Sequence, residues 1–370
     1  MKKIYLDTVS TTRPDPAVIK TYEDLLEKTY VNSDALYDDG VTLYNLQEDA
    51  RKRVASLLGV SAEEVIFTSG ASEANSLAIK GCAWAHPEKK HLITSIYEHS
   101  SVYGAASQLE RLGWKVTYLR PDKEGKIAPQ AVREALRPDT VLVSIMFVNN
   151  ELGSINDVKT IAEIVKKESH ACFHCDITQA LGKIPVDLTN IDLASFSAHK
   201  IHGLKGSGAL IRRRHVPLEP LVSGGQQEGG LRGGTSNAPL NIVLAKTLRL
   251  ALEQQPQEEA HDRRLKEVLL QELQEIPEVT VNSPADGIAN LVSLSTPVKS
   301  EVLLNALNKS GIMVSSRSTC GSRKNEPSRV LTSMGIDDER AIRVSFDREN
   351  TEEEILLFTK SLKEIIKKYG

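Results

Sequence analysis

The residue with the greatest chemical potential in this sequence is Lys200, in the stretch SFSAHKIHG (195–203) between an apolar run and a glycine-rich one. Its amine has three possible uses: a surface charge, a phosphate ligand, or a nucleophile that bonds covalently to an aldehyde cofactor. Most lysines are only solvated. The choice therefore depends on the other groups that the fold brings to Lys200.

The stretch FTSGASEAN (67–75) supplies a candidate anion site. A predicted strand ends there, a glycine permits a tight turn and a helix begins. The backbone N–H groups of Gly70, Ala71 and Ser72 then point at a common anion, assisted by the helix dipole. No G-K-[ST] and no G-x-G-x-x-G is present, so this is neither a Walker loop nor a dinucleotide-binding turn. A capped helix without a ligand is the alternative.

Two further polar residues follow predicted strands. Asp176 in FHCDITQ ends a buried strand, and a buried carboxylate needs a cationic partner. The pyridinium nitrogen of pyridoxal 5'-phosphate (PLP) is such a partner, and a structural salt bridge is the alternative. His99 in YEHSSV could stack on a pyridine ring and exchange protons, or serve only as a helix cap. The order of anion turn, aspartate and lysine predicts one PLP site with Lys200 as its amine.

The elements that must position these residues alternate between strand and helix through the first two thirds of the chain. This alternation predicts a mostly parallel sheet with helices on both faces, whose ligands bind beyond the carboxyl ends of the strands. Polar residues follow five apolar runs: VIF, LIT, IMFV, FHC and ASF. From about residue 240 a long helical stretch, expected to be interrupted near Pro256, leads into a smaller α/β portion. We expect a large PLP-binding domain over 16–255 and a small domain formed by 1–15 and 256–370.

Composition narrows the function. The 370 residues are 40% hydrophobic and 26% charged, with a net charge of −3, which favours neither nucleic acid nor a membrane surface as a partner. No apolar run of 18 residues exists, and the N-terminus lacks a secretory apolar stretch, so a cytoplasmic location is expected. Cys172 and Cys175 lie three apart on a predicted strand and face opposite sides, so no metal site is expected. We expect both, and Cys82 in a helix, to be packing residues.

Several motifs, in order along nearly the whole chain, resemble those of the class V, fold-type-I PLP enzymes, specifically cysteine desulfurases of the NifS/IscS type. They are YLD…TT, FTSGASEANSLAIKG, EHSSV, VSIMFVNNELG, FHCDITQALGKIPVDL, SFSAHKIHGLKGSGAL, LRGGTSN, SSRSTCGSRKNEPSRVL and AIRVSF. The resemblance implies an α/β fold with a large, mostly parallel seven-stranded sheet domain and a small C-terminal α/β domain.

The resemblance also implies how PLP is held. Lys200 bonds covalently to the aldehyde, Asp176 pairs with the pyridine nitrogen, and Asn150 and Gln179 address the ring hydroxyl. Thr235 reaches the phosphate bound by a neighbouring subunit, which implies a homodimer with active sites at the interface. The residues implied to bind the phosphate within one subunit are Ala71, Ser72, Ser197 and His199.

The reaction implied by the resemblance is the conversion of L-cysteine to L-alanine, with a persulfide left on Cys320 for a sulfur-acceptor protein in iron–sulfur cluster assembly or in tRNA or cofactor thiolation. His99 stacks on the ring and moves protons, Arg343 binds the substrate carboxylate, and Asn32 occupies a substrate-binding position. Positive residues flank the thiol in sequence and favour the thiolate; an inert thiol is the alternative. They are Arg317, Arg323 and Lys324.

This sequence departs from the family pattern around the substrate entrance. The changed positions are Thr8, Val9, Ser10, Ser33, Asp34, Ala35, Tyr37, Gly229, Arg317, Thr319 and Asp347. They predict an altered partner or substrate preference, while the cofactor set is intact. Two alternatives stay open: another PLP enzyme of the class (a selenocysteine lyase, a β-eliminating lyase or an aminotransferase), and a catalytically inactive dimer that binds a partner.

Overall fold

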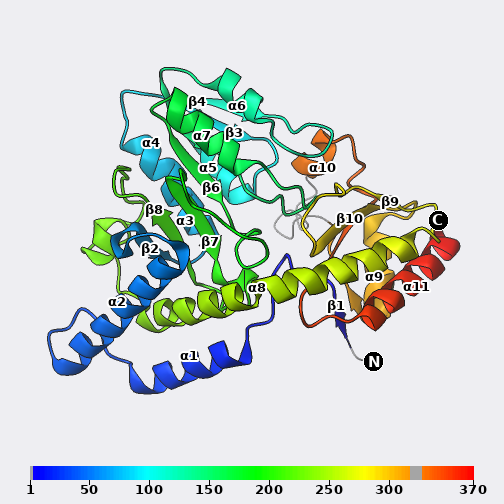
Figure 1. Ribbon diagram of the computed structural model, residues 1–370, viewed down its shortest axis with the longest axis horizontal. Helices are drawn as coiled ribbons and strands as arrows, with labels where there is room; N and C mark the ends of the chain where they lie inside the picture. The colour runs from blue at the N-terminus through cyan, green and yellow to red at the C-terminus, as the bar shows by residue number, and fades with distance from the viewer. Residues whose placement is uncertain (1–2, 317–326) are drawn as a thin grey trace.

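The structure is a computed structural model that describes residues 3–316 and 327–370 (Figure 1). The strands of its largest sheet are β2 (Val65–Thr68), β3 (His91–Ser95), β4 (Lys115–Leu119), β5 (Thr140–Ser144), β6 (Cys172–Asp176), β7 (Leu193–Ser197) and β8 (Gly208–Arg212). They are ordered β2-β8-β7-β6-β5-β3-β4, with only β8 antiparallel to its neighbours. The predicted mostly parallel seven-stranded sheet is confirmed.

Helices pack on both faces of this sheet. They are α2 (Asp38–Leu58), α3 (Ala71–Ser76), α4 (Cys82–Trp84), α5 (Ser100–Arg111), α6 (Pro129–Ala135) and α7 (Val158–Glu168). Helix α1 (Pro16–Lys28) packs instead on α8 (Ala238–Leu273). One apolar cluster joins the sheet to α2, α6 and α7, and a separate cluster joins it to α3, α4 and α5. Gly59, at φ 64, ends α2 in the left-handed conformation that favours glycine, as the sequence predicts.

Helix α8 (Ala238–Leu273) is continuous through Pro256, so the interruption expected there is wrong. Figure 1 shows it as one long rod that runs from the large sheet to the C-terminal part. Its first part packs on α2 and its last part on α11 (Glu352–Tyr369), and these contacts outweigh the hydrogen bond that proline removes. Because one helix spans position 256, the domain boundary at 255/256 stays a prediction.

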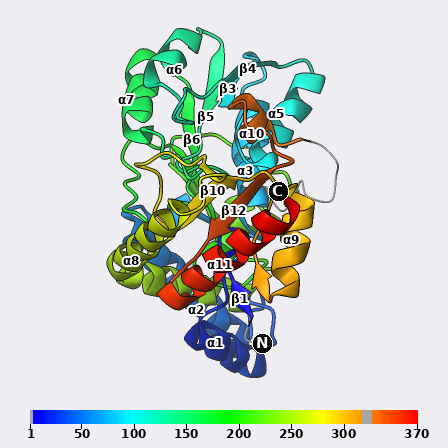
Figure 2. The same ribbon diagram turned by 90° about the vertical axis from the view of Figure 1, so that its right-hand side faces the viewer.

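The C-terminal part has its own core. Strands β9 (Thr280–Val281), β10 (Leu291–Ser295) and β12 (Ala341–Ser345) form an antiparallel sheet in the order β12-β10-β9. The N-terminal β1 (Ile4–Tyr5) pairs in parallel with β11 (Ile312–Met313). Figure 2 shows α9 (Ser300–Lys309) and α11 side by side here, and a short α10 (Arg329–Ser333) near the large sheet. Among the described residues, no helix is long and apolar enough to cross a membrane.

Candidate active site

A cavity of about 290 Å³ lies beyond the carboxyl ends of the large sheet, and all five strand ends that carry polar residues contribute to its wall. Two residues of the N-terminal segment and one of β12 complete it. The lining residues are Val9, Ser10, Ala71, Ser72, His99, Met146, Asn150, Asp176, Thr178, Gln179, Ser197, His199, Lys200 and Arg343. The fold therefore brings together every predicted site residue except Asn32, Thr235 and Cys320.

The anion turn lies at one end of this cavity, where a continuous helical run begins at Ala71. Gly70 has φ 143, a conformation that side chains disfavour, and a Cβ there would approach Ser197 Oγ to 3.1 Å. On β8, a Cβ on Gly208 would lie 2.7 Å from Gly70 Cα. The turn therefore packs against the sheet without room for side chains. Ala71 N donates to Ser197 Oγ at 2.7 Å, which places a hydroxyl and the first helical N–H groups together, as a phosphate requires.

His199 adds a neutral donor at the same end. Burial, followed by the charge of Lys200, lowers the pKa of His199 to about 4. Its Nδ1 lies 3.1 Å from Thr11 Oγ1, a hydroxyl that can donate to it. The proton of the neutral ring then resides on Nε2, which is left to donate to an anion.

Asp176 is a buried carboxylate with two hydrogen bonds. Thr178 N donates to Oδ1 at 2.9 Å and Asn75 Nδ2 donates to Oδ2 at 2.7 Å. No lysine or arginine of the described residues forms an ion pair with it, so the structural salt bridge considered from sequence is not observed there. A buried carboxylate that faces a cavity and lacks a protein cation suits a protonated pyridine nitrogen. The sequence does not identify Asn75 as a site residue, because it does not show which face of α3 points toward Asp176.

His99 both caps a helix and lines the cavity, so its capping role does not exclude the ring-stacking role, which stays a prediction. Its Nδ1 accepts from Ser101 N at 3.2 Å at the start of α5 and lies 2.8 Å from Ser101 Oγ. Burial lowers its pKa, against the opposing effect of Asp176. Because Nδ1 accepts the capping bond, the ring proton resides on Nε2, and the ring is fixed in one tautomer.

Lys200 follows β7 in a 3-10 turn, Ala198–Lys200. Its Nζ donates to the carbonyl oxygens of Val9 at 2.7 Å and Ser10 at 2.6 Å. The N-terminal segment is thus held against the amine from across the sequence. A lysine amine on the wall of this cavity, with a buried aspartate and an anion turn on the same wall, fits PLP.

Arg343 projects from the second sheet into the same cavity and is 3% exposed. Its Nη1 donates to Asn150 O at 2.7 Å, and its Nη2 donates to Asp7 Oδ1 at 2.9 Å and Ser10 Oγ at 2.7 Å. Its Nε is buried and has no hydrogen-bond partner among the described residues. The Nη1 and Nη2 bonds fix the guanidinium in place, and the Nε donor is left without a partner among the described residues. A guanidinium in this state can bind a carboxylate.

Three predicted site residues do not line the cavity. Asn32 and Thr235 are exposed in this single chain, and Cys320 lies outside the described residues. Asn32 Oδ1 accepts from Asp34 N at 2.9 Å in a local turn. The binding roles of Asn32 and Thr235 therefore stay predictions.

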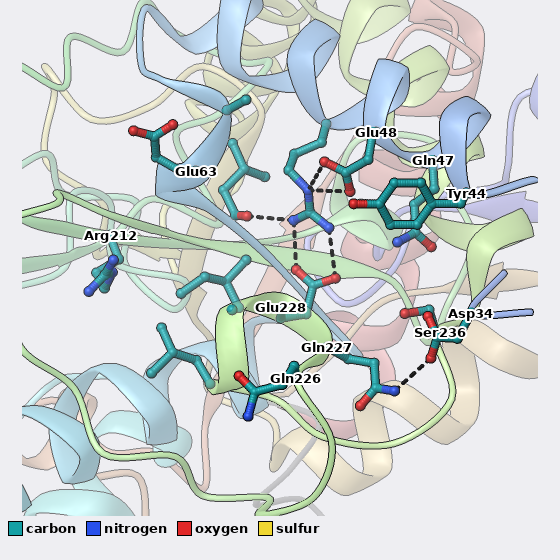
Figure 3. Close-up of a pocket in the computed structure, with 16 residues that line it drawn as sticks. Asp34, Tyr44, Gln47, Glu48, Glu63, Arg212, Gln226, Gln227, Glu228 and Ser236 are labelled. Carbon is teal, nitrogen blue, oxygen red and sulfur yellow. Dashed lines mark hydrogen bonds and ion pairs between the residues drawn. The ribbon is translucent and has the colours of Figure 1, made fainter. Parts of the chain in front are cut away.

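The loop that carries Thr235 is anchored at a second hollow, of about 490 Å³, beside α2 (Figure 3). Arg51 donates to both carboxylate oxygens of Glu228, at 2.7 and 2.9 Å, and Glu228 also accepts from Phe67 N at 2.8 Å. Glu48 binds the same guanidinium, as Figure 3 shows. Because Arg51 is neutralised in this way, the hollow is a loop anchor and not another anion site.

Gly229, one of the positions expected to depart from the family pattern, lies in an unusual stretch of backbone beside the second hollow. Glu228, Gly229 and Gly230 have φ values of 50, 65 and 80, a left-handed run. Gln227 Nε2 donates to Asp34 Oδ2 at 2.6 Å, which ties this loop to the segment before α2. Of the other altered residues, Ser33 is buried, Tyr37 is exposed, and Asp347 is buried with an oxygen 3.7 Å from His202 Nε2.

The remaining singled-out residues are structural, as predicted. Cys172 packs with Cys82 in one cluster, whereas Cys175 belongs to the cluster on the opposite face of the sheet. His202 is buried, and its Nδ1 lies 3.0 Å from Arg13 O. The described residues contain no group of three or more His, Cys, Asp or Glu side chains that could hold a metal ion.

Comparisons with known proteins agree with this geometry. The family model "Aminotransferase class-V" matches residues 4–358, and the chain belongs to this family of α/β enzymes. It is similar to the protein named "Cysteine desulfurase IscS" of Methanosarcina thermophila, with 39% identity over 99% of this chain and 93% of the relative. Among solved structures, it is similar to a "NIFS-like protein" (TM-score 0.93, 35% identity, 99% of each chain). It is also similar to "SspA in complex with cysteine" (TM-score 0.82, 34% identity, 93% of this chain and 98% of that one).

Proposed function

We propose that this protein is a PLP-dependent cysteine desulfurase that converts L-cysteine to L-alanine and leaves the sulfur as a persulfide on Cys320. One observation carries the proposal: a single cavity joins a lysine amine, a buried aspartate and an arginine, and within the described part of the chain the aspartate has no ion pair and the arginine Nε has no hydrogen-bond partner. Relatives named as cysteine desulfurases, and a similar structure described as a complex with cysteine, support this reaction over others of the class.

Different residues of the cavity would hold different parts of PLP. Lys200 would form the covalent bond to its aldehyde, Asp176 would keep the ring nitrogen protonated, and His99 would stack on the ring. Asn150 and Gln179 would bind on the side of the ring hydroxyl. When bound, PLP would supply an electron sink for the substrate. The residues that would bind its phosphate are Ala71, Ser72, Ser197 and His199.

Arg343 binds the carboxylate of the amino acid. Asp7, Ser10 and the Asn150 carbonyl fix its guanidinium, so little side-chain entropy is lost when substrate binds. His99, whose ring proton resides on Nε2, would donate a proton on the cavity side. Asn32 contributes to substrate binding from the altered entrance.

Cys320 receives the sulfur. The Cys320 thiolate bonds to the substrate sulfur as the carbon–sulfur bond breaks, the electron pair stays with the substrate carbon, and protonation of that carbon yields alanine. Ser315 pairs with Arg343 through two backbone hydrogen bonds, and Cys320 follows five residues later. A chain of five residues reaches at most about 17 Å, which is consistent with access from the cavity wall.

The assembly is a cytoplasmic homodimer with active sites at the interface. Thr235 is exposed on an anchored loop and supplies the partner subunit's phosphate site. Exposed apolar side chains support a dimer contact. The exposed apolar side chains on the segment before α2, on α2 itself and at position 222 include Tyr30, Leu36, Tyr37, Val41, Tyr44 and Val222. The persulfide passes to a sulfur-acceptor protein of iron–sulfur cluster assembly or of tRNA or cofactor thiolation.

A second candidate is a related class V PLP enzyme with another amino-acid substrate. Ser10 Oγ accepts a hydrogen bond from Arg343 at the point where a substrate carboxylate would bind. Because this bond occupies one N–H donor of Arg343, fewer donors remain for the substrate carboxylate. The site then favours a different amino-acid substrate from a site in which every N–H of the arginine is available.

The test is mass spectrometry of the purified protein after incubation with L-cysteine. We expect one added sulfur on the peptide that contains Cys320, alanine in the solution, and neither in Cys320→Ser, which keeps the visible absorbance of bound PLP. Turnover of L-cysteine that survives Cys320→Ser would contradict the role of Cys320. Turnover of another amino acid in place of L-cysteine would favour the second candidate. Absence of any PLP absorbance in the wild type would contradict both.

A further inference from the structure

Lys183 lies behind one wall of the cavity and has no role in the site described so far. It follows Gln179 by four residues, after β6, and its Nζ donates a 2.6 Å hydrogen bond to Gln179 Oε1. Its backbone is fixed as well, because Lys183 N donates to Ala180 O at 3.0 Å and Lys183 O accepts from Gln255 Nε2 at 3.4 Å. Gln179 lines the cavity and Lys183 does not.

The partners of Gln179 determine which end of its amide faces which way. Gln179 Nε2 donates to Val9 O at 3.2 Å, on the side away from Lys183. A backbone carbonyl only accepts, so the NH2 group of Gln179 must face Val9, and Oε1 then faces Lys183, whose Nζ donates to it. The reverse orientation would bring two donors together at Lys183 and two acceptors together at Val9. The amide therefore offers the cavity an N–H donor.

The same contacts connect two lysines. Val9 O also accepts from Lys200 Nζ at 2.7 Å, so a chain of hydrogen bonds runs from Lys183 through Gln179 and Val9 to Lys200. A carbonyl oxygen has two lone pairs and can accept both bonds. The orientation of Gln179 and the position of the N-terminal segment against Lys200 thus depend on one another.

The charge on Lys183 is not neutralised by a close carboxylate. The described residues hold no ion pair with its Nζ, and burial, followed by the charge of Lys200, lowers its pKa to about 7. Arg343 acts in the same direction, whereas Asp262 and Asp347 oppose it from farther away. The hydrogen bond to Gln179 is therefore the principal polar contact of a largely buried cation.

We propose that Lys183 is a positioning residue for the cofactor site: its bond to Gln179 Oε1 holds the amide with its N–H donor toward the cavity, where the ring hydroxyl of PLP binds. This inference rests on the proposed function, since it assumes that PLP occupies the cavity. Lys183 acts through Gln179 and touches neither cofactor nor substrate.

The test is a double-mutant cycle on the full-length protein, with PLP itself as the probe. Lys183→Met keeps the length of the chain and removes the donor. We expect a roughly three- to thirtyfold weaker affinity of the PLP-free protein for PLP, the loss expected for one oriented hydrogen bond. The pH midpoint of the visible absorbance of lysine-bound PLP should also rise, because the ring oxygen loses its donor. In a Gln179→Ala background the same change should have no further effect on either quantity. Lys183→Arg should restore both.

Other outcomes would overturn the inference. An equal effect of Lys183→Met with and without Gln179 would show that Lys183 acts through its charge alone, and no effect in either background would show that it does not act. Lys166→Met is the matched control: Lys166 is exposed, its Nζ binds only Asn190 Oδ1 in the described structure, and both readouts should be unchanged. If Lys183→Met does not fold, Lys183→Gln carries the same expectations. A wild-type protein without PLP absorbance would refute the proposed function instead.

Discussion

The cofactor side and the substrate side of the cavity are built in different ways. The cofactor side comes from the ends of adjacent strands of one sheet, and its groups are fixed by short hydrogen bonds such as those of Asp176 to Asn75 and Thr178. The substrate side is assembled from distant parts of the chain, since Arg343 on β12 meets Asp7 and Ser10 across more than 330 residues. The large sheet alone therefore positions the cofactor side, whereas the position of the substrate side depends on how the C-terminal part and the N-terminal segment meet.

This difference implies that changes on the cofactor side abolish function, whereas changes on the substrate side alter selectivity. The departures from the family pattern follow the same division. Ser10 touches Arg343, and Gly229 lies in the loop that carries Thr235. The strand-end residues around Asp176 and Lys200 keep the family pattern.

The largest effect is expected from Lys200→Ala. Removal of the amine should lower turnover of L-cysteine at least about 1,000-fold and remove the absorbance of lysine-bound PLP. Steady-state kinetics and an absorbance spectrum measure both. Lys205→Ala, an exposed neighbour, is the control. If Lys200→Ala kept more than a tenth of the wild-type rate, the cofactor side would not be organised as described.

The next largest effect concerns stability and involves Glu98, which is fully buried on the cofactor side. Its Oε1 accepts from Ser95 Oγ and Met146 N, both at 2.9 Å, and its Oε2 has no partner among the described residues. Burial is the main cause that raises its pKa from 4.5 to about 8, and Asp176 adds to it. Between these two pH values the unfolded state binds fewer protons than the folded state, so stability falls as pH rises from about 4.5 to about 8.

Glu98→Gln removes this titration. The free energy of unfolding of the variant, measured with urea, should change less than that of the wild type over this pH window, by an amount on the order of a few kcal/mol. A wild type and a variant with parallel pH profiles would show that Glu98 is ionised in the folded protein at neutral pH.

On the substrate side, Arg343→Lys should raise KM for L-cysteine about tenfold or more, because an ammonium cannot form the planar paired bonds of a guanidinium. The absorbance of bound PLP should be unchanged, since no cofactor contact is lost. Arg120→Lys, at an exposed arginine, is the control. Equal losses in kcat and in PLP affinity would instead place Arg343 on the cofactor side.

The smallest effect is expected from Ser10→Ala. Loss of its hydroxyl releases an N–H of Arg343 Nη2 for the substrate carboxylate, and KM for L-cysteine should fall roughly two- to fivefold, as for one modest hydrogen bond. Ser10→Thr keeps a hydroxyl and should behave as the wild type does. A KM that rises in Ser10→Ala would show that Ser10 itself binds the substrate.

The same division explains how far the sequence could predict the molecule. Apolar runs that end in polar residues identify strand ends, and parallel strands must bring these ends to one edge, so Asp176, Lys200 and His99 could be placed together. The resemblance to a family supplied roles that spacing alone leaves open. Asn75, Glu98 and Lys183 were missed because their importance depends on which face of an element points inward.

Other features required tertiary information. Pro256 lies inside a helix because packing against α2 and α11 overrides a local preference, which no single segment shows. Thr235 and Asn32 are exposed away from the cavity, and Cys320 lies outside the described residues. Their roles stay predictions, as does the domain boundary at residue 255.

The central claim, that the cavity at the strand ends holds PLP through Lys200, is tested most directly by borohydride reduction of the PLP-loaded protein followed by peptide mass spectrometry. The account predicts one stable pyridoxyl-phosphate adduct per chain, on Lys200. An adduct on a different lysine, such as Lys183 or Lys205, or an unmodified Lys200 in protein that has bound PLP, would contradict it.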